Sequence, residues 1–333
     1  MLREAKHELY KGQCNCAYWH GVFGGLYLSH LRRAVYHHLL TAEGLLDRLN
    51  GSQPREIHDD LDGDGHDELV LRNTRLGVVV DPQENGTVTE VDDYRHAVNV
   101  LDTMARHREP YHQKLHTNVS AGAGSGLRPA SIHDLLQAKE EGLHAYLVYD
   151  DHRRSSFADY AFSMRPTLQQ IVRNTWTEHR MFPAGSYQMV ASRSSSRGQA
   201  AVQMVRRVAQ GTLRKTVTLM RTEPRLRFRY EVDQLAIPVV GLEMTLGLWN
   251  PEWAEPQWEE RIGQFDLQDG SLPIRLTLMI DPPATVARLP IYTVSESEGG
   301  MERTAQGLAV VCLWELAGEP RWSCDIDWVI GSC

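Results

Sequence analysis

A succession of short alternating segments, which begins near residue 66, constrains the fold of this chain more than any other feature. Apolar and polar residues alternate within each segment, and turn residues such as those of 81–86 separate the segments, which is typical of half-buried β-strands. Long helices, which βαβ units need between consecutive strands, are scarce among them. The expected strands are 68–72, 76–80, 87–91, 143–149, 216–220, 226–231, 242–249, 274–280 and 308–314. The pattern predicts a mainly β protein built around a large antiparallel sandwich.

A helical segment precedes these strands. Apolar residues recur there at spacings of three and four, which predicts an amphipathic helix of about 20 residues with a stripe that must pack on a partner. The residues of this stripe are Leu28, Leu31, Val35, Leu39, Ala42, Leu46 and Leu49. Ser29 can cap the start of the helix, and Asn50-Gly51 can end it. A second helix is expected over residues 131–142, and small-residue loops are expected at 120–126 and 192–198.

Composition excludes several classes of protein. The chain has 333 residues and a formal net charge of −8, which argues against nucleic-acid binding because that function needs a basic face. No apolar run approaches the roughly 18 residues of a membrane helix, and the first residues lack the apolar core of a signal peptide. Five cysteines are too few for a disulfide scaffold. These features predict a cytoplasmic protein that neither enters a membrane nor binds nucleic acid.

The stretch from residue 13 to residue 36 is dense in polar and aromatic side chains. A glycine-rich turn follows them at once, and the predicted helix comes next. The four side chains able to stack on a ligand or to form hydrogen bonds with it are Asn15, Tyr18, Trp19 and His20. They are candidates for ligand binding, and the alternative is that they pack the junction between two helices. Cys14 and Cys16 with His20 would give only three zinc ligands, so reduced, buried thiols are the preferred interpretation.

An acidic loop at residues 60–68 has the spacing of a calcium loop. Carboxylates at alternate positions can surround a hard cation where a glycine permits a tight turn. Asp60, Asp62 and Asp64 occupy positions 1, 3 and 5, Gly65 the turn, His66 position 7 through its carbonyl, and Glu68 position 9. Position 12 is Leu71, so the bidentate glutamate of an EF-hand is missing, and a strand follows instead of a helix. We expect a structural Ca²⁺ that ties the helical segment to the sandwich; a solvated acidic turn is the alternative.

The stretch 13–36 closely resembles the last conserved region of the family 57 glycoside hydrolases, the α-amylases and 4-α-glucanotransferases. Further blocks at 62–71, 105–112, 147–159 and 292–307 resemble the later blocks of that family in the same order. The resemblance implies a β-supersandwich of the galactose mutarotase type over residues 57–333. Residues 1–56 would form the helical end of the region that adjoins the catalytic barrel. It also implies that Asn15, Tyr18, Trp19 and His20 contact sugar in the cleft.

The barrel that should precede the opening stretch is absent, and with it the glutamate nucleophile and the aspartate acid of the family. No position here matches either residue, so no catalytic residue is assigned. The expected function is the C-terminal, non-catalytic portion of an α-glucan-processing enzyme, with a maltooligosaccharide ligand and a barrel supplied in cis or in trans. A stand-alone glucan-binding or assembly subunit is the alternative. A weaker hypothesis makes the sandwich itself a mutarotase, which would require a converging histidine and glutamate.

Overall fold

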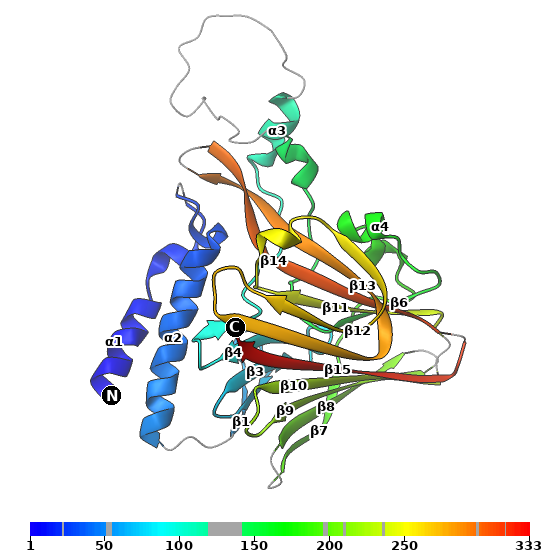
Figure 1. Ribbon diagram of the computed structural model, residues 1–333, viewed down its shortest axis with the longest axis horizontal. Helices are drawn as coiled ribbons and strands as arrows, with labels where there is room; N and C mark the ends of the chain where they lie inside the picture. Colours follow the sequence, from blue (N-terminus) through cyan, green and yellow to red (C-terminus); the bar gives the residue numbers. More distant parts are fainter. Residues whose placement is uncertain are drawn as a thin grey trace, which may run out of the picture.

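The computed structural model describes residues 1–21, 23–50, 55–118, 142–195, 199–208, 211–234, 237–297, 300–316 and 318–333. Two sheets form the body of the protein, and a pair of helices lies along one side of it (Figure 1). The predicted architecture, a large antiparallel sandwich preceded by a helical segment, is confirmed. The helix expected over 131–142 falls on residues of which all but Gly142 lie outside the described part of the chain, and the loop expected at 120–126 lies wholly outside it. The loop expected at 192–198 is wrong for residues 192–195, because their backbone pairs with a neighbouring strand as part of β7 (Gln188–Ser195), whereas 196–198 lie outside the described residues.

The helical segment begins with a helix that the sequence pattern did not indicate, α1 (Leu2–Gly12). Two short 3-10 helices, η1 (Asn15–Tyr18) and η2 (Gly25–Tyr27), connect it to α2 (Ser29–Asn50), which matches the predicted amphipathic helix. Gly12 lets α1 approach α2 closely, since a Cβ there would lie 2.6 Å from the Leu39 side chain. Glu8 and His38 join the two helices by a 2.6 Å contact.

The smaller sheet has five strands, paired antiparallel in chain order. They are β1 (Arg55–Asp59), β2 (Glu68–Arg72), β3 (Leu76–Asp81), β4 (Thr87–Asp93) and β5 (Val98–Asn99). The acidic loop is therefore the turn between β1 and β2. Between this sheet and the next element lie α3 (His112–Asn118) and η3 (Leu143–Tyr146).

The larger sheet has ten antiparallel strands, and strands far apart in sequence lie side by side within it (Figure 1). Along its main path the order is β6-β11-β14-β13-β15-β10-β9-β8-β7, and β12 pairs with β13. Their bounds are β6 (Ala158–Phe162), β7 (Gln188–Ser195), β8 (Gln199–Val208), β9 (Gly211–Met220), β10 (Arg225–Asp233), β11 (Val239–Leu246), β12 (Gln257–Gln268), β13 (Ile274–Ser297), β14 (Gly300–Glu315) and β15 (Arg321–Ser332). Short helices α4 (Leu168–Val172), η4 (Trp176–His179) and η5 (Pro251–Trp253) lie between strands.

The main core lies between the two sheets. Alternate residues of β2, β3 and β4 face alternate residues of the larger sheet, among them Phe228 and Trp328. A second apolar cluster covers the opposite face of the larger sheet at β6, β11, β13 and β14, where Ile171 of α4 and Trp176 pack on it. Both faces of this part of the larger sheet are therefore covered, and every residue of β11 is buried.

A fully buried ion pair lies inside the sandwich core. Lys215 of β9 has no exposed surface, and its Nζ lies 2.6 Å from Oδ1 of Asp159 on β6. The ammonium group also donates to the backbone carbonyls of Asn85 and Phe157, at 2.6 and 2.8 Å. Burial lowers the pKa of Lys215, although the charge of Asp159 opposes this shift. The pair therefore joins β9 and β6 of the larger sheet through fully desolvated groups, and the bond to Asn85, in the turn between β3 and β4, links Lys215 to the smaller sheet.

One predicted strand is wrong. Residues 143–149 begin with η3 instead of a strand, and Gly142, in the left-handed region at φ 77°, precedes that helix. Leu143 is buried in a small cluster with Tyr111, Val294 and Met301. The apolar alternation there arises because one side of an irregular segment packs on β13 and β14, whereas the other side faces away.

Candidate functional site

The aromatic stretch lies in the connection between α1 and α2, and its backbone is held in a compact turn. The carbonyl of Trp19 accepts a 3.0 Å hydrogen bond from the amide of Leu26, which brings η1 and η2 together. Gly25 is required at this point, because its φ is +52° and a Cβ would lie 2.1 Å from the Trp19 carbonyl oxygen. The glycines of the motif therefore set the direction of the aromatic side chains.

Three of the four predicted ligand-binding residues lie on the surface. Tyr18 and Trp19 are 60% and 53% exposed, and Asn15 is also exposed. The Tyr18 hydroxyl donates a 2.8 Å hydrogen bond to the carbonyl of Gly12, so this ring is fixed although it faces solvent. Phe23 adds a further aromatic ring that is 71% exposed. Large aromatic side chains are usually buried, so this concentration in one short stretch indicates a binding surface.

His20, the fourth predicted residue, faces the sandwich. Its ring packs edge-on against Tyr27 and Tyr111, with centroids 4.8 and 5.5 Å away. Its Nδ1 lies 4.0 Å from a carboxylate oxygen of Glu109, and its Nε2 lies 3.4 Å from the carbonyl oxygen of Glu296 on β13. These contacts position the stretch 18–20 on the sandwich, while Tyr18 and Trp19 remain accessible.

Tyr27 and Glu109 form the buried support of this surface. The Tyr27 hydroxyl donates a 2.5 Å hydrogen bond to the Glu109 carboxylate. Burial, together with the hydrogen bond to Glu109, raises the pKa of Tyr27 well above its ordinary value, so the phenol remains a donor at any physiological pH. Nothing in the sequence near Glu109 indicated this role, since the two residues are 82 positions apart.

Arg32, in the first turns of α2, ties the stretch to the sandwich. Its Nε donates to Asp102 at 2.9 Å, one Nη donates to the Leu26 carbonyl at 2.5 Å, and the other donates to Gln306 at 2.9 Å. The Gln306 amide in turn donates to the carbonyl of Tyr27 at 2.8 Å. Sequence reasoning missed Arg32, Asp102 and Gln306; the polar Gln306 immediately before an apolar strand was the one available signal.

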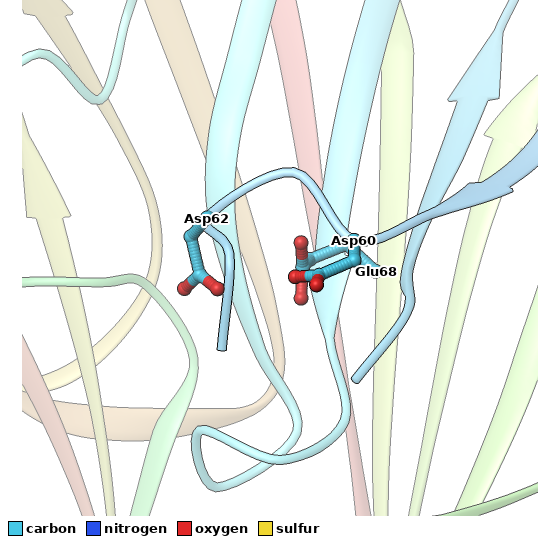
Figure 2. Close-up of side chains that lie close together, drawn as sticks. All are labelled: Asp60, Asp62 and Glu68. Carbon is cyan, nitrogen blue, oxygen red and sulfur yellow. The ribbon is translucent and has the colours of Figure 1, made fainter. Parts of the chain in front are cut away.

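The acidic loop brings three of its predicted metal ligands together. Figure 2 shows the Asp60 and Glu68 carboxylates side by side and Asp62 across the loop. One oxygen from each of Asp60, Asp62 and Glu68 lies within 4.8 Å of the others, a group of donors suited to a hard cation. Glu68 is only 4% exposed, and burial, with the nearby charges of Asp62 and Asp81, raises its pKa. A cation would remove this electrostatic cost.

The Asp64 carboxylate is not part of that group, and the backbone carbonyl of His66 stays a predicted ligand. Asp64 accepts a hydrogen bond from the amide of His66 at 2.8 Å, and the Asp60 carboxylate accepts from the amides of Gly63 and Asp64 at 2.9 and 3.0 Å. The loop therefore holds its shape partly through its own carboxylates. An ion pair joins the loop to the sandwich, because Asp62 lies 3.8 Å from the guanidinium group of Arg153. Glu43 and Asp47 of α2 pair with Arg72 of β2, at 3.2 and 2.8 Å. The expected tie between the helical segment and the sandwich through a Ca²⁺ in this loop stays a prediction.

A histidine and a glutamate do converge within the sandwich, as the mutarotase hypothesis required. His152 Nε2 lies 3.7 Å from Glu243, and Glu243 also accepts hydrogen bonds from Arg154 at 2.6 Å and from Tyr160 at 3.0 Å. Burial alone would lower the pKa of His152, but its interactions with Glu243 and Asp151 raise it to about 9. The two groups form a mutual ion pair instead of facing each other across a sugar, which makes them poor partners for acid-base catalysis.

The positions of the cysteines do not support a zinc site either. Cys14, Cys16 and Cys333 are exposed, so the predicted burial holds only for Cys312 and Cys324, and all five are free thiols. Among the described residues, the carboxylate group of the acidic loop is the one cluster with metal-ligand geometry.

Comparison with models of known protein families gives two matches, which together cover most of the chain. Residues 60–326 match the model of the alpha-amylase/4-alpha-glucanotransferase C-terminal domain, and residues 1–46 match the middle domain of the same proteins. The chain belongs to the alpha-amylase/4-alpha-glucanotransferase family. The C-terminal match covers nearly all of the sandwich core, with Trp328 and Ile330 beyond its end, and the middle-domain match contains the exposed aromatic stretch and most of α2.

Relatives of known activity are about twice as long. This member of the alpha-amylase/4-alpha-glucanotransferase family is 31% identical to alpha-amylase 1 of Dictyoglomus thermophilum over 332 residues, which cover 94% of this chain and 46% of the relative. It is 30% identical to the 4-alpha-glucanotransferase of Thermococcus kodakarensis, with 96% and 47% covered. The crystal structure of the 4-alpha-glucanotransferase from Thermococcus litoralis superposes with a TM-score of 0.76 at 24% identity, over 98% of this chain and 46% of that one.

The chain therefore spans about half the length of the curated relatives it matches. Within the part of the chain that the structure describes, no helix combines the length and the apolar character needed to cross a membrane.

Proposed function

We propose that this chain is the glucan-contacting and supporting portion of an α-glucan-processing enzyme, of the 4-α-glucanotransferase or α-amylase type. The chemical step belongs to a catalytic region outside these 333 residues. The observation that carries the proposal is the exposed pair Tyr18 and Trp19, fixed on a rigid support within the segment that matches the family's middle domain. Half the length of the relatives remains for the catalytic region.

The exposed stretch has the chemistry that a glucan requires. The flat face of Trp19 can stack on the apolar face of a glucosyl ring, and Asn15 and the Tyr18 hydroxyl can exchange hydrogen bonds with sugar hydroxyls. His20 and Arg32 act as positioning residues, because both bind the sandwich and fix the backbone that carries these side chains. The arrangement suits one wall of a cleft whose other wall another region supplies.

The exposed apolar side chains of the N-terminal segment support a partner there. Apart from Tyr18, Trp19 and Phe23, the exposed large apolar residues of this segment are Met1, Leu2, Leu9 and Tyr10. Clusters of this kind mark protein interfaces more often than free surface. We infer that the catalytic region packs against this segment, whether it belongs to the same polypeptide or to a separate subunit.

Two further assignments are proposed with this function. Ca²⁺ would bind Asp60, Asp62 and Glu68 and neutralise a buried carboxylate, which would stabilise the β1–β2 turn. Its role would be structural, because the loop is distant from the aromatic stretch in the sequence and the contacts described above do not join the two. A cytoplasmic location is supported by the five free thiols, which suit a reducing compartment.

The test uses maltotriose and separates binding from catalysis. The pure chain should produce no ladder of redistributed maltooligosaccharides, whereas the chain together with its catalytic region should. In that complete enzyme, Trp19→Ala should reduce kcat/KM by about two- to tenfold, the range expected for a lost aromatic contact of about 0.5–1.5 kcal/mol. Met164→Ala removes a similarly exposed apolar side chain elsewhere and should change nothing. A ladder from the pure chain, or equal effects of both substitutions, would refute the proposal.

Sequencing the DNA upstream of the Met1 codon shows whether the catalytic region belongs to the same polypeptide or to a separate subunit. An in-frame catalytic region would make this chain part of one polypeptide. A stop codon followed by a ribosome-binding site would favour the separate glucan-binding or assembly subunit.

A further inference from the structure

A cavity of about 320 Å³ opens on the face of the larger sheet that the smaller sheet does not cover. Residues of β13 and β14 form its floor, α4 and the segment 145–148 form two sides, and residues 254–256 form a third. In Figure 1, α4 lies beside β6 and β11 on this part of the molecule. The cavity is at the small end of the 300–1,000 Å³ that is usual for small-molecule sites, so it suits one or two sugar rings.

Aromatic and aliphatic side chains make up most of its wall. Tyr146 and Tyr292 meet edge to face with centroids 5.6 Å apart, and the guanidinium group of Arg303 lies over both rings, at 4.3 and 4.6 Å. These contacts fix the two rings before any ligand arrives, which reduces the entropy lost on binding. Aliphatic groups of Ile291 and Val311 continue the apolar surface. Such a wall matches the CH face of a pyranose ring.

Charged groups at the inner end of the cavity are balanced among themselves. Arg106 donates to Asp150 at 3.0 and 2.7 Å, and Arg154 donates to Asp150 at 3.1 and 2.6 Å and to Glu243 at 2.6 Å. Two guanidinium groups thus face two carboxylates at this end of the cavity, and among the described lining residues Glu255 on the wall is the one charged residue outside this network. The network still offers both donors and acceptors at the cavity surface, which favours a neutral ligand with several hydroxyl groups.

We propose that this cavity is a second carbohydrate site, which holds one or two α-linked glucosyl units of the glucan on the sandwich. The inference rests on the proposed function for the choice of sugar. It is independent of the N-terminal stretch, because none of residues 13–28 lines the cavity. A glucan held there would stay associated with the protein between reaction cycles, while the exposed aromatic stretch positions another part of the polymer.

The test measures binding of maltose to the chain by ligand-observed saturation-transfer NMR, with mannitol as a non-ring polyol control. Ala254→Trp and Ala145→Trp each place an indole in the cavity from an exposed position on opposite walls. Ala184→Trp is the matched control, because it is equally exposed but lines a separate pocket near His152. Trp19→Ala removes the other candidate site. Circular dichroism verifies that each variant is folded.

Wild-type chain should bind maltose and should not bind mannitol. In a Trp19→Ala background, which isolates the cavity, each cavity-filling variant should weaken maltose binding at least tenfold, whereas Ala184→Trp should leave it within twofold. Loss of binding with Trp19→Ala alone would overturn the second site while supporting the proposed function. Absence of binding to the wild-type chain, or equal binding by Ala254→Trp and Ala184→Trp, would also overturn it. The activity test of the complete enzyme is separate, so failure of one proposal can be told from failure of the other.

Discussion

Replacing Lys215 by methionine should destabilise the protein far more than its single charge suggests. The substitution keeps most of the side-chain volume and removes the ammonium group that faces Asp159, Asn85 and Phe157. Asp159 would remain buried with hydroxyl donors from Tyr187 and Tyr230, each at 3.0 Å, but without a counter-charge. Breaking one side of a buried pair costs about 3–5 kcal/mol, because the remaining charge has lost its solvation and its partner.

The expected change in melting temperature follows from chain length. Unfolding entropy is about 2.1 cal/mol/K per residue, which for 333 residues gives about 0.7 kcal/mol/K. A loss of about 3–5 kcal/mol therefore lowers Tm by about 4–7 °C, measured by calorimetry or circular dichroism. Asp159→Asn should also destabilise, and the double variant should lose less than the sum of the two, because neither charge remains unpaired.

Lys11→Met is the matched control for this argument. Lys11 also pairs with a carboxylate, Glu8, at 2.7 Å, but the pair is on the surface of α1. Exposed ion pairs contribute little to stability because water screens them, so this variant should change Tm by no more than about 1 °C. A Lys215→Met protein within about 1 °C of wild type, or strictly additive effects in the Lys215 and Asp159 variants, would refute the reasoning from burial.

Three further outcomes are expected. Arg32→Met leaves the buried Asp102 carboxylate unpaired. Amide hydrogen exchange in η1 and η2 should become faster, whereas the sandwich strands should keep their protection. Unchanged exchange in η1 and η2 would contradict the positioning role of Arg32. Because the pKa of His152 is raised to about 9 from an ordinary value of about 6.5, its pairing with Glu243 stabilises the fold below about pH 6.5, and that contribution is lost as pH rises toward 9. The Tm difference between wild type and His152→Gln should accordingly shrink between pH 6 and pH 9, and a difference independent of pH would oppose this. Ca²⁺ at 100 times its Kd should stabilise the protein by about 2.7 kcal/mol relative to chelator, an effect that Glu68→Gln should remove; an equal shift in that variant would exclude the loop as the site.

Most strands could be predicted from the sequence because each carries its own signal. In the segment 213–219 the inward positions hold Leu213, Lys215, Val217 and Leu219. The predicted strand 216–220 contained two of these inward positions but stopped short of Lys215, so neither the buried lysine nor its partner Asp159 was predicted. Residues 143–149 show the limit of the method, since an irregular segment packed along one side produces the same apolar pattern as a strand. The helix α1 has only Ala5 and Gly12 buried, so its apolar signal was weak.

The candidate sites were predictable where their residues are contiguous. Asn15, Tyr18 and Trp19 lie within five residues, and the ligands of the acidic loop lie within nine, so spacing alone indicated them. Their supports come from distant parts of the chain: Glu109 binds Tyr27 across 82 positions, and Gln306 binds it across 279. Such pairs depend on which strands become neighbours, and periodicity within one strand carries no information on that. The cavity on the larger sheet was invisible for the same reason.

The position of β15 sets an order on the assembly of the larger sheet. β15 pairs with β13 on one side and β10 on the other, so it joins the group β6-β11-β14-β13 to the group β10-β9-β8-β7. It also follows every other strand in the sequence, so a ribosome must translate to residue 332 before the two groups can be joined. Until then each group exposes an unpaired strand edge to solvent or to other nascent chains. The larger sheet therefore cannot be completed before β15 is synthesised. A chaperone that shields β10 and β13 during synthesis would protect the two strand edges that stay unpaired until then.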